Sequence, residues 1–167
     1  MPISNQVLLS DLNAHFGDFI SEAHEPYGLL TVNTTREKIQ DILTYLFNHP
    51  EFKFQFLTDL TGVHFPENAG QELGVVYHLH SLETNTRLRL KVFFPIADPI
   101  IPSVQELFST ANWMERETYD FFGIIFSGHP NLIRILNMED MDYFPMRKEY
   151  TLEDPTRRDK LDAKFGR

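Results

Sequence analysis

The spacing of hydrophobic residues changes along the chain, and the changes predict a succession of helices and strands. In two early segments apolar residues recur at intervals of three and four, which places them on one face of a helix. These positions are Leu8, Leu9, Leu12, Phe16, Phe19 and Ile20 in the first segment and Ile39, Ile42, Leu43 and Leu46 in the second. Thr34 and Glu37 stand in capping-box positions before the second helix. Residues 27–33, between the two helices, predict a short strand.

Apolar and polar residues alternate in the middle of the chain. Residues 73–82 and 87–94 are separated by a short polar stretch, a pattern typical of a β-hairpin. In the second of these strands the cations Arg87, Arg89 and Lys91 stand between apolar residues, so one face is predicted to be buried and the other basic. The apolar run 57–63 predicts a further strand ahead of the hairpin.

A third amphipathic segment predicts a helix over residues 103–122, with Ser103 and Glu106 in capping-box positions. A short apolar piece follows at 124–126, and beyond it the chain is rich in charge and poor in aliphatic residues. The order helix, strand, helix, strand, hairpin, helix is not a regular alternation of strand and helix. It predicts an α+β fold with two layers, in which helices lie on one face of a mixed or antiparallel sheet.

Composition excludes several kinds of chemistry. The chain has 167 residues, 42% of them hydrophobic, which is enough for a domain with its own core. It contains no cysteine, so it cannot form disulfides, thiolate-bound iron–sulfur clusters, cysteine-containing zinc sites or a cysteine nucleophile. The net charge of −9 opposes a general nucleic-acid role. We expect no membrane span and no signal peptide, because no long apolar run is present and the first residues lack the signal pattern.

Familiar catalytic and ligand-binding motifs are absent from the sequence. There is no G-x-G-x-x-G, G-x-S-x-G or H-E-x-x-H. Gly123 and Gly128 have the spacing of a phosphate loop, but His129 and a proline follow where lysine and serine or threonine are required. His78 and His80 share one face of a strand, yet a third metal ligand at recognisable spacing is missing. An ordinary sheet face explains this pair better than a metal site.

Charged and aromatic side chains concentrate in residues 113–123. Arg116 and Asp120 are four residues apart, hence neighbours on a helix. Three interpretations are open: a solvated helix face with salt bridges, an interface whose charges pair with another subunit, and paired carboxylates for acid–base or metal chemistry. Residues 128–136 and 143–150 add prolines, aromatic residues and bases without a core periodicity. They are either surface loops or a surface that another chain completes.

The residues of this region resemble a known family. Segments 111–124, 126–130 and 134–136 are similar to the signature of the 30 kDa subunit, also named the C subunit, of the proton-pumping NADH:quinone oxidoreductase, respiratory complex I. Segments 76–79, 101–104 and 145–150 extend the resemblance, which covers about residues 27–150. Ile133 departs from the family, which commonly has a base or proline there, and Met-Arg-Lys-Glu at 146–149 replaces Leu-Arg-Lys-Asp. The first departure removes one possible cationic contact.

The resemblance implies a two-layer α+β domain, residues 1–136, with an extended C-terminal arm, residues 137–167, that contacts partner subunits. It implies a peripheral-arm subunit that carries no cofactor, while other subunits hold NADH, FMN, iron–sulfur clusters and quinone. The expected partners are the D subunit, which forms the quinone site, and the cluster-bearing B and I subunits, on the cytoplasmic side of the bacterial inner membrane. The expected role is assembly and stability of the module that carries electrons from NADH to quinone, coupled to ion translocation.

The resemblance also implies that no residue of this chain is catalytic, binds a cofactor or binds a metal. The expected interface and signature residues are Trp113, Glu115, Arg116, Glu117, Tyr119, Asp120, Gly123, His129, Pro130, Arg134, Pro145, Arg147 and Lys148. Two alternatives are open. One is the equivalent subunit of a related membrane-bound hydrogenase or of a quinone oxidoreductase with another donor. The other is an independent enzyme that uses Glu115, Glu117, Asp120 and His129.

Overall fold

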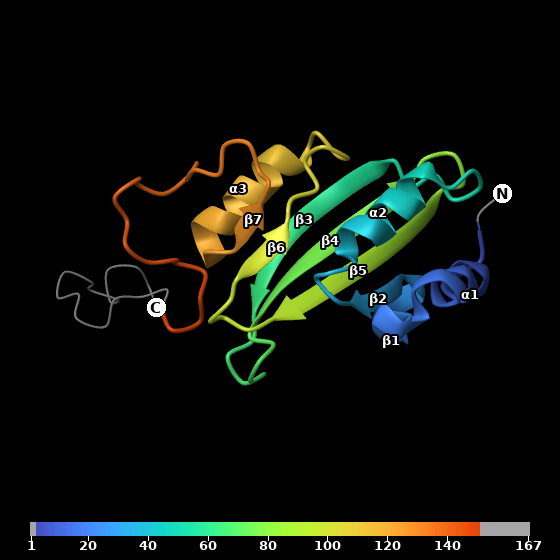
Figure 1. The fold of residues 1–167 in the computed structure, drawn as a ribbon, viewed down its shortest axis with the longest axis horizontal. Coiled ribbons are helices and arrows are strands. Elements are labelled where there is room, and N and C mark those ends of the chain that lie inside the picture. The colour runs from blue at the N-terminus through green and yellow to red at the C-terminus, as the bar shows by residue number, and fades with distance from the viewer. Residues whose placement is uncertain (1–2, 151–167) are drawn as a thin grey trace, which may run out of the picture.

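The computed structural model describes residues 3–150 (Figure 1). The helices are α1 (Asn5–Phe16), α2 (Ile39–Asn48) and α3 (Ala111–Phe122), and short 3-10 turns occupy Gly17–Phe19 and Pro26–Gly28. The strands are β1 (Ile20–His24), β2 (Leu30–Thr34), β3 (Phe56–His64), β4 (Leu73–Ser81), β5 (Thr86–Phe94), β6 (Ile100–Pro102) and β7 (Ile125–Ser127).

The first five strands form one mixed sheet. Their order is β1-β2-β5-β4-β3, in which β2 and β5 are parallel and the other neighbours are antiparallel. The predicted hairpin is β4 and β5, which pair from Leu73 opposite Phe94 to Ser81 opposite Thr86. The strands β6 and β7 form a separate parallel pair that brackets α3 in the sequence.

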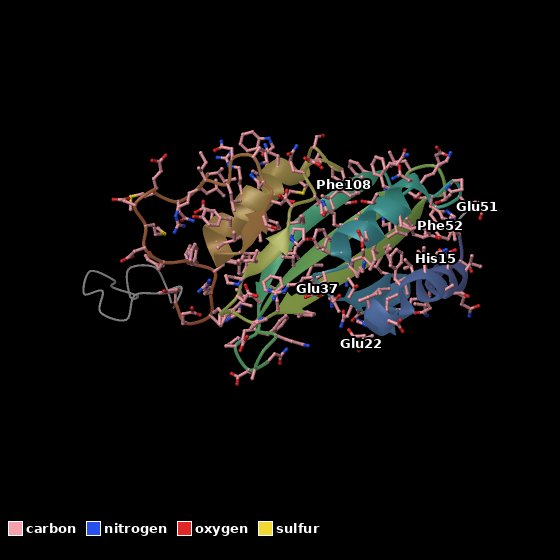
Figure 2. The ribbon with its side chains drawn as sticks, viewed as in Figure 1. His15, Glu22, Glu37, Glu51, Phe52 and Phe108 are labelled. Carbon is pink, nitrogen blue, oxygen red and sulfur yellow. The ribbon has the colours of Figure 1, made fainter. Side chains whose placement is uncertain are left out.

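The helices pack together on one face of the sheet. In Figure 1, α2 lies in front of β4 and β5, and it buries the apolar face that its spacing predicts. The Tyr45 hydroxyl of α2 donates to Asp11 of α1 at 2.7 Å, and Tyr45 also lies against His15 of α1, which Figure 2 labels. On its other side α2 places Phe47 edge-on to Phe108, 5.5 Å between ring centroids. The predicted two-layer α+β fold is confirmed.

The alternation in β5 separates the two faces of the sheet. Leu88, Leu90 and Val92 are fully buried under the helices, whereas Arg87 and Lys91 project from the opposite face. This confirms the prediction of one buried and one basic face. We call the second surface the open face, made by Arg87, Arg89 and Lys91 of β5 and the side chains beside them on β3 and β4.

A glycine lets α3 lie directly on the sheet. A Cβ atom at Gly62 of β3 would lie 2.5 Å from the ring of Phe122, the last residue of α3. A larger residue at position 62 would therefore push α3 away from the core. The contact fixes the helix that carries the charged signature against the edge strand.

Three local predictions are wrong. The first helix ends at Phe16, and Ile20 begins the edge strand β1 instead of continuing the helical face. The second helix begins at Ile39 after Lys38, so the capping box starting at Thr34 does not form, because Thr34 belongs to β2 and its hydroxyl donates to the carbonyl of Phe19.

The third helix is shorter than predicted. It begins at Ala111, and residues 103–110 form a separate turn. The Ser103 hydroxyl accepts from the backbone N–H of Gln105 and donates to Glu115 on α3, so it does not cap the predicted helix, and Glu106 is exposed. A tertiary contact thus replaces the local cap.

Candidate functional site

The charged signature lies on α3 and faces the segment that follows β7. We call this segment, residues 128–150, the strap. It contains no helix or strand, and in Figure 1 it runs beside α3. Polar contacts join the two elements along most of the length of α3, so the candidate site is the junction of α3 with the strap.

Asp120 is the centre of this junction. Its side chain is fully buried. One carboxylate oxygen accepts the backbone N–H groups of Ile135, Leu136 and Asn137 at 2.8–3.1 Å. The other oxygen accepts from the side chains of Asn137 at 3.1 Å and Arg134 at 2.8 Å. One carboxylate therefore closes a loop of the strap around itself.

Arg134 joins the carboxylate to the far part of the strap. One terminal nitrogen of its guanidinium donates to Asp120, and the other donates to the carbonyls of Met141 and Tyr143 at 2.8 and 3.0 Å. The guanidinium carbon lies 5.0 Å from the ring centroid of Phe144. The side chain is only 8% exposed, so this ion pair is internal to the chain.

The contacts of Asp120 determine its protonation. Burial raises the pKa of this carboxyl, but the hydrogen bonds from Asn137, Arg134 and Leu136 outweigh burial and hold the pKa well below its usual range. Asp120 is therefore ionised at neutral pH and paired with a cation inside the domain. The surrounding strap depends on that charge.

Glu115 is equally buried but has fewer donors. It accepts from the Ser103 hydroxyl at 2.6 Å and from the backbone N–H of Val104 at 2.7 Å. Burial raises the pKa of Glu115 to about 7, and these two hydrogen bonds offset only part of the effect. Tyr77 is fully buried, and burial together with the charge of Glu115 raises the pKa of its phenol. Glu115 fastens the 103–110 turn to α3.

Arg116 and His129 hold the start of the strap. Arg116 donates to the carbonyls of Ile133 and Arg134 at 3.1 and 3.3 Å, and its guanidinium lies 4.9 Å from the Trp113 ring. His129 donates from Nε2 to the carbonyl of Asn112 at 3.1 Å and accepts the N–H of Asn131 at Nδ1. Both ring nitrogens of His129 are thus engaged by the backbone.

Gly123 ends α3 in a conformation that suits glycine. Its φ is +73°, and its N–H closes the helix on the carbonyl of Tyr119 at 2.8 Å. A Cβ atom here would lie 2.5 Å from the ring of Phe144 and 2.7 Å from the guanidinium of Arg147. Arg147 donates to the carbonyl of Phe122 at 2.7 Å and stacks on Phe144 at 4.7 Å. The strap therefore caps the helix end.

The end of the strap reaches the sheet. The backbone N–H of Lys148 donates to Nδ1 of buried His64 on β3 at 2.9 Å, and Glu149 lies 3.5 Å from the same nitrogen. The Lys148 side chain itself is exposed. Pro145 is half-buried, and Tyr119 meets Phe144 edge-on at 6.2 Å. Residues 151–167, the rest of the predicted arm, lie outside the described residues.

The predicted site residues divide into an internal and an exposed group. Glu115, Arg116, Asp120 and Arg134 are buried or nearly so and have partners in this chain. Trp113 is 60% exposed, and Glu117 and Pro130 are exposed; Glu117 forms no ion pair with any residue in 3–150. The solvated-face interpretation is therefore wrong for Glu115 and Asp120. Whether a partner contacts the exposed group stays a prediction.

Sequence reasoning missed several residues of the junction. Asn137 binds Asp120 through both its backbone and its side chain, and Phe144 lies under two guanidinium groups. Leu136 and Met138 stand out on the exposed surface of the strap, 65% and 68% exposed. For Leu136 and Met138, the only signal in the sequence was their apolar character in a segment without core periodicity.

Metal and membrane sites were sought in the described part of the chain. Residues 3–150 hold no group of three or more His, Asp or Glu side chains placed to bind a metal ion. His78 accepts from Arg89 at 2.8 Å, and His80 lies 3.1 Å from Asn85, so each histidine has its own partner. No helix in the same range has the length and apolar character needed to cross a bilayer.

Comparison with known proteins places this junction in a family. The family described as "Respiratory-chain NADH dehydrogenase, 30 Kd subunit" matches residues 32–156, which include β3 to β7, α3 and the whole strap. The chain belongs to this family. The match thus covers the strands β3, β4 and β5 of the sheet and the α3–strap junction, and the resemblance seen in the sequence is confirmed.

Individual relatives agree with the 30 Kd subunit assignment. The C subunit of the NADH-quinone oxidoreductase of Mycolicibacterium smegmatis is 45% identical over 74% of this chain and 52% of its own length. The chain thus spans about half the length of the curated relatives it matches. The solved structure of Nqo5, a trypsin-resistant fragment (1-134) in P63 form, aligns with TM-score 0.66 and 30% identity, over 78% of this chain and 100% of that one.

A second solved structure shares the fold of the 30 Kd subunit family. It is a chain of the membrane-bound sulfane sulfur reductase, an archaeal respiratory membrane complex, with TM-score 0.72 and 23% identity. It covers 88% of this chain and 85% of that one. At this identity the likeness shows the fold alone.

Proposed function

We propose that this chain works as the 30 kDa subunit of an NADH:quinone oxidoreductase and that its task is structural. It holds neighbouring subunits in place while they carry electrons. Membership of the 30 Kd subunit family and the names of its relatives support this assignment. In this proposal NADH, FMN, the iron–sulfur clusters and quinone are bound by other subunits of the enzyme. This chain, which lacks cysteine, holds no cofactor.

The observation that carries the proposal is which groups of the strap face the domain and which face solvent. Backbone groups of the strap bind Asp120 and Arg116, whereas the apolar side chains of Ile133, Leu136, Met138 and Met146 are exposed. Leu136 and Met138 are 65% and 68% exposed, and Trp113 of α3 is 60% exposed. Large exposed apolar side chains on a fixed scaffold are typical of protein–protein contact surfaces. We call Trp113, Ile133, Leu136, Met138 and Met146 the apolar surface.

The geometry opposes an independent enzyme built from the carboxylate cluster. Glu115 and Asp120 are fully buried, and their oxygens already accept hydrogen bonds from this chain. His129 uses both ring nitrogens in backbone contacts, and Glu117 projects into solvent. General acid–base catalysis needs groups that reach a substrate together, and these four groups do not converge.

Finer assignments follow from the family resemblance. The partners are the D subunit, which forms the quinone site, and the cluster-bearing B and I subunits, contacted by the apolar surface and by the arm, residues 137–167. The chain is located in the peripheral arm of the complex, on the cytoplasmic side of the bacterial inner membrane. The contacts of the strap hold the first residues of the arm, 137–150, against α3 and against His64 of β3.

A second candidate is the equivalent subunit of a related complex with another electron donor. The family resemblance leaves it open, because other subunits determine the electron donor. The two candidates differ in the subunits that should accompany this chain. A flavin-containing NADH-oxidising subunit supports the first candidate, and a nickel-site hydrogenase subunit or another donor subunit supports the second.

The test is to recover the tagged full chain from gently solubilised membranes and identify its companions by mass spectrometry. We expect a quinone-site subunit and cluster-bearing subunits in stoichiometric amounts. Recovery of the chain alone, or of metal or NADH turnover with the isolated chain, contradicts the proposal. Leu136→Glu should reduce the companions strongly because it places a charge on the apolar surface. Leu82→Glu is the matched control, since Leu82 is 70% exposed in the hairpin loop.

A further inference from the structure

The open face of the sheet has an unusual charge for this protein. The chain has a net charge of −9, yet Arg87, Arg89 and Lys91 project from one side of the central strand β5. Successive outward side chains of a strand are about 7 Å apart, so the three cations repel one another. The helices α1, α2 and α3 pack on the other face, and the cations lie on the face that these helices leave uncovered.

The cations have no carboxylate partner in the part of the chain that the structure describes. No ion pair among residues 3–150 includes any of the three cations of β5. Arg89 donates from Nε to the ring of His78 at 2.8 Å, which is an uncharged acceptor in this contact. The carboxylate of Asp59, next across the sheet, faces the same ring at 3.6 Å. Within residues 3–150 this row thus has no direct carboxylate partner, although the chain as a whole is acidic.

One end of the open face also has a hydrogen-bond acceptor without a donor in residues 3–150. A cavity of about 300 Å³ is lined by Asn33, Thr35, Phe93 and neighbouring residues. The side-chain oxygen of Asn33 is buried and has no partner among the described residues, while its amide group donates to Glu22 at 2.8 Å. Asn33 pairs with Lys91 in the parallel register of β2 and β5, so the cavity adjoins the cations. Buried acceptors gain free energy from an N–H donor that reaches them.

We propose that the open face binds an acidic, extended segment of another subunit of the complex. Its carboxylates pair with Arg87 and Lys91, and one of its amide groups donates to the Asn33 oxygen in the cavity. Charge complementarity selects the occupant, because an acidic segment is attracted to this face and repelled by the rest of the surface. Phe65 and Phe93, 6.0 Å apart, provide an apolar contact at the same end. The inference rests on the proposed function, since it needs a multisubunit complex.

Nucleic acid and anionic lipid share the negative charge but fit the molecule less well. Both present extended phosphate surfaces, and an acidic body with one short basic row opposes their close approach. A peptide segment matches the width of a few strands and can supply N–H donors to Asn33. These other occupants become outcomes of the experiment.

The experiment places a photo-crosslinking amino acid at Thr61, an exposed residue of β3 in the same cross-strand row as Lys91. The full chain is crosslinked in intact membranes of its host, and the attached peptide is identified by mass spectrometry. A parallel sample carries the probe at Trp113, on the apolar surface. We expect Thr61 to capture an acidic segment of another subunit.

Each result decides between the two proposals. A crosslink from Thr61 to lipid, nucleic acid or a second copy of this chain overturns the inference, and so does no crosslink there while Trp113 captures a subunit. If neither position captures another subunit, the proposed function fails as well. The two failures are therefore distinguishable.

A charge reversal tests the same row. Arg87→Glu with Lys91→Glu should reduce the Thr61 crosslink about tenfold, because the attraction becomes repulsion. Lys38→Glu with Lys53→Glu makes the same change in charge on other parts of the surface and should leave the yield unchanged. Equal yields from both pairs overturn the inference. If the reversed chain does not fold by circular dichroism, Arg87→Gln with Lys91→Gln repeats the test.

Discussion

Each half of α3 holds an acidic side chain that solvent does not reach, and the pKa values of the two carboxyl groups are shifted in opposite directions. Asp120, near the end of the helix, has a pKa held well below its usual range. Glu115, near the beginning, has a pKa raised to about 7. Both side chains are fully buried. The difference comes from their partners and from depth, because Glu115 lies deeper in the domain and receives fewer donors, and both effects raise its pKa relative to that of Asp120.

The number and charge of the donors decide which effect is larger. Asp120 receives a guanidinium, an amide side chain and several backbone N–H groups from the strap. Glu115 receives one hydroxyl and one N–H from the 103–110 turn. Burial penalises both charges, but only the first set of donors exceeds that penalty. A buried carboxylate is thus a fixed anchor at one end of α3 and a titratable group at the other.

The largest expected effect is the loss of the anchor. Asp120→Ala should lower the free energy of unfolding by about 3–5 kcal/mol, because it leaves the Arg134 guanidinium buried without its carboxylate. If the Asp120 charge paired instead with a partner subunit, the same change would leave the fold of the isolated chain intact and reduce assembly. Urea unfolding of the full chain at pH 7 measures the difference. Asp140→Ala, at an exposed acid of the strap, should change stability by less than about 0.5 kcal/mol. Equal effects of the two changes would contradict the comparison.

The second effect is a dependence on pH from Glu115. Its folded pKa of about 7 exceeds the ordinary 4.5, so the folded state binds the proton more tightly than the unfolded chain. Stability should therefore fall as pH rises from about 4.5 to 7, by on the order of 3 kcal/mol, and then stay level. Asp120 acts in the opposite sense, because its stabilisation is lost as pH falls below about 4.

Glu115→Gln isolates this contribution. The amide cannot ionise, so the fall in stability between about pH 4.5 and 7 should disappear, and unfolding midpoints measured across that range should become flat. Glu106→Gln changes an exposed glutamate of the same region and serves as the control. If the dependence of stability on pH survives Glu115→Gln and is lost in Glu106→Gln, Glu115 is not the titrating group.

The third effect tests the helix end beside Asp120. Gly123→Ala should cost about 1–3 kcal/mol, because φ is +73° and the new methyl group would press on Phe144. Gly17→Ala is the matched control, since Gly17 has a helical φ of −52° and open space at its Cβ position. Thermal unfolding of both variants makes the measurement. A stable Gly123→Ala protein would show that the strap does not hold the helix end.

The smallest effect sharpens the Glu115 end. Ser103→Ala removes a hydrogen bond that lowers the pKa of Glu115, so the pKa should rise above 7 and stability should drop by about 1 kcal/mol. The pH dependence of unfolding reports both changes. Ser109→Ala, at an exposed position of the same turn, should leave the midpoint of the pH dependence unchanged. An unchanged midpoint in Ser103→Ala would mean that Ser103 does not bind the carboxylate.

Much of the fold could be predicted because its signals are local. The hairpin β4–β5 and the buried face of α2 follow from spacing alone, since alternate residues share a face of a strand and every third or fourth residue shares a face of a helix. The start of α3 could not be predicted in this way. Residues 103–110 have helical spacing, but the turn they form is set by Glu115, which is distant in the sequence.

The sequence named part of the α3–strap junction but not how its residues are arranged. Glu115, Arg116, Asp120, Arg134 and Arg147 were named as interface and signature residues through the family resemblance, while the residues alone left their charge partners open. In the structure, their partners are backbone groups of the strap and of the 103–110 turn. Backbone donors and acceptors occur at every position, so no residue pattern marks which of them will be used.

The sequence by itself determined the two layers, the basic row on β5, the lack of thiolate ligands and the family of the chain, because these depend on residue types and short spacings. Only the tertiary structure decided that the strap folds back on α3. That closure makes Asp120 an internal anchor and turns Leu136 and Met138 outward. The physical reason is that a buried charge is stable only where donors from distant parts of the chain meet it, and their meeting is a property of the folded chain.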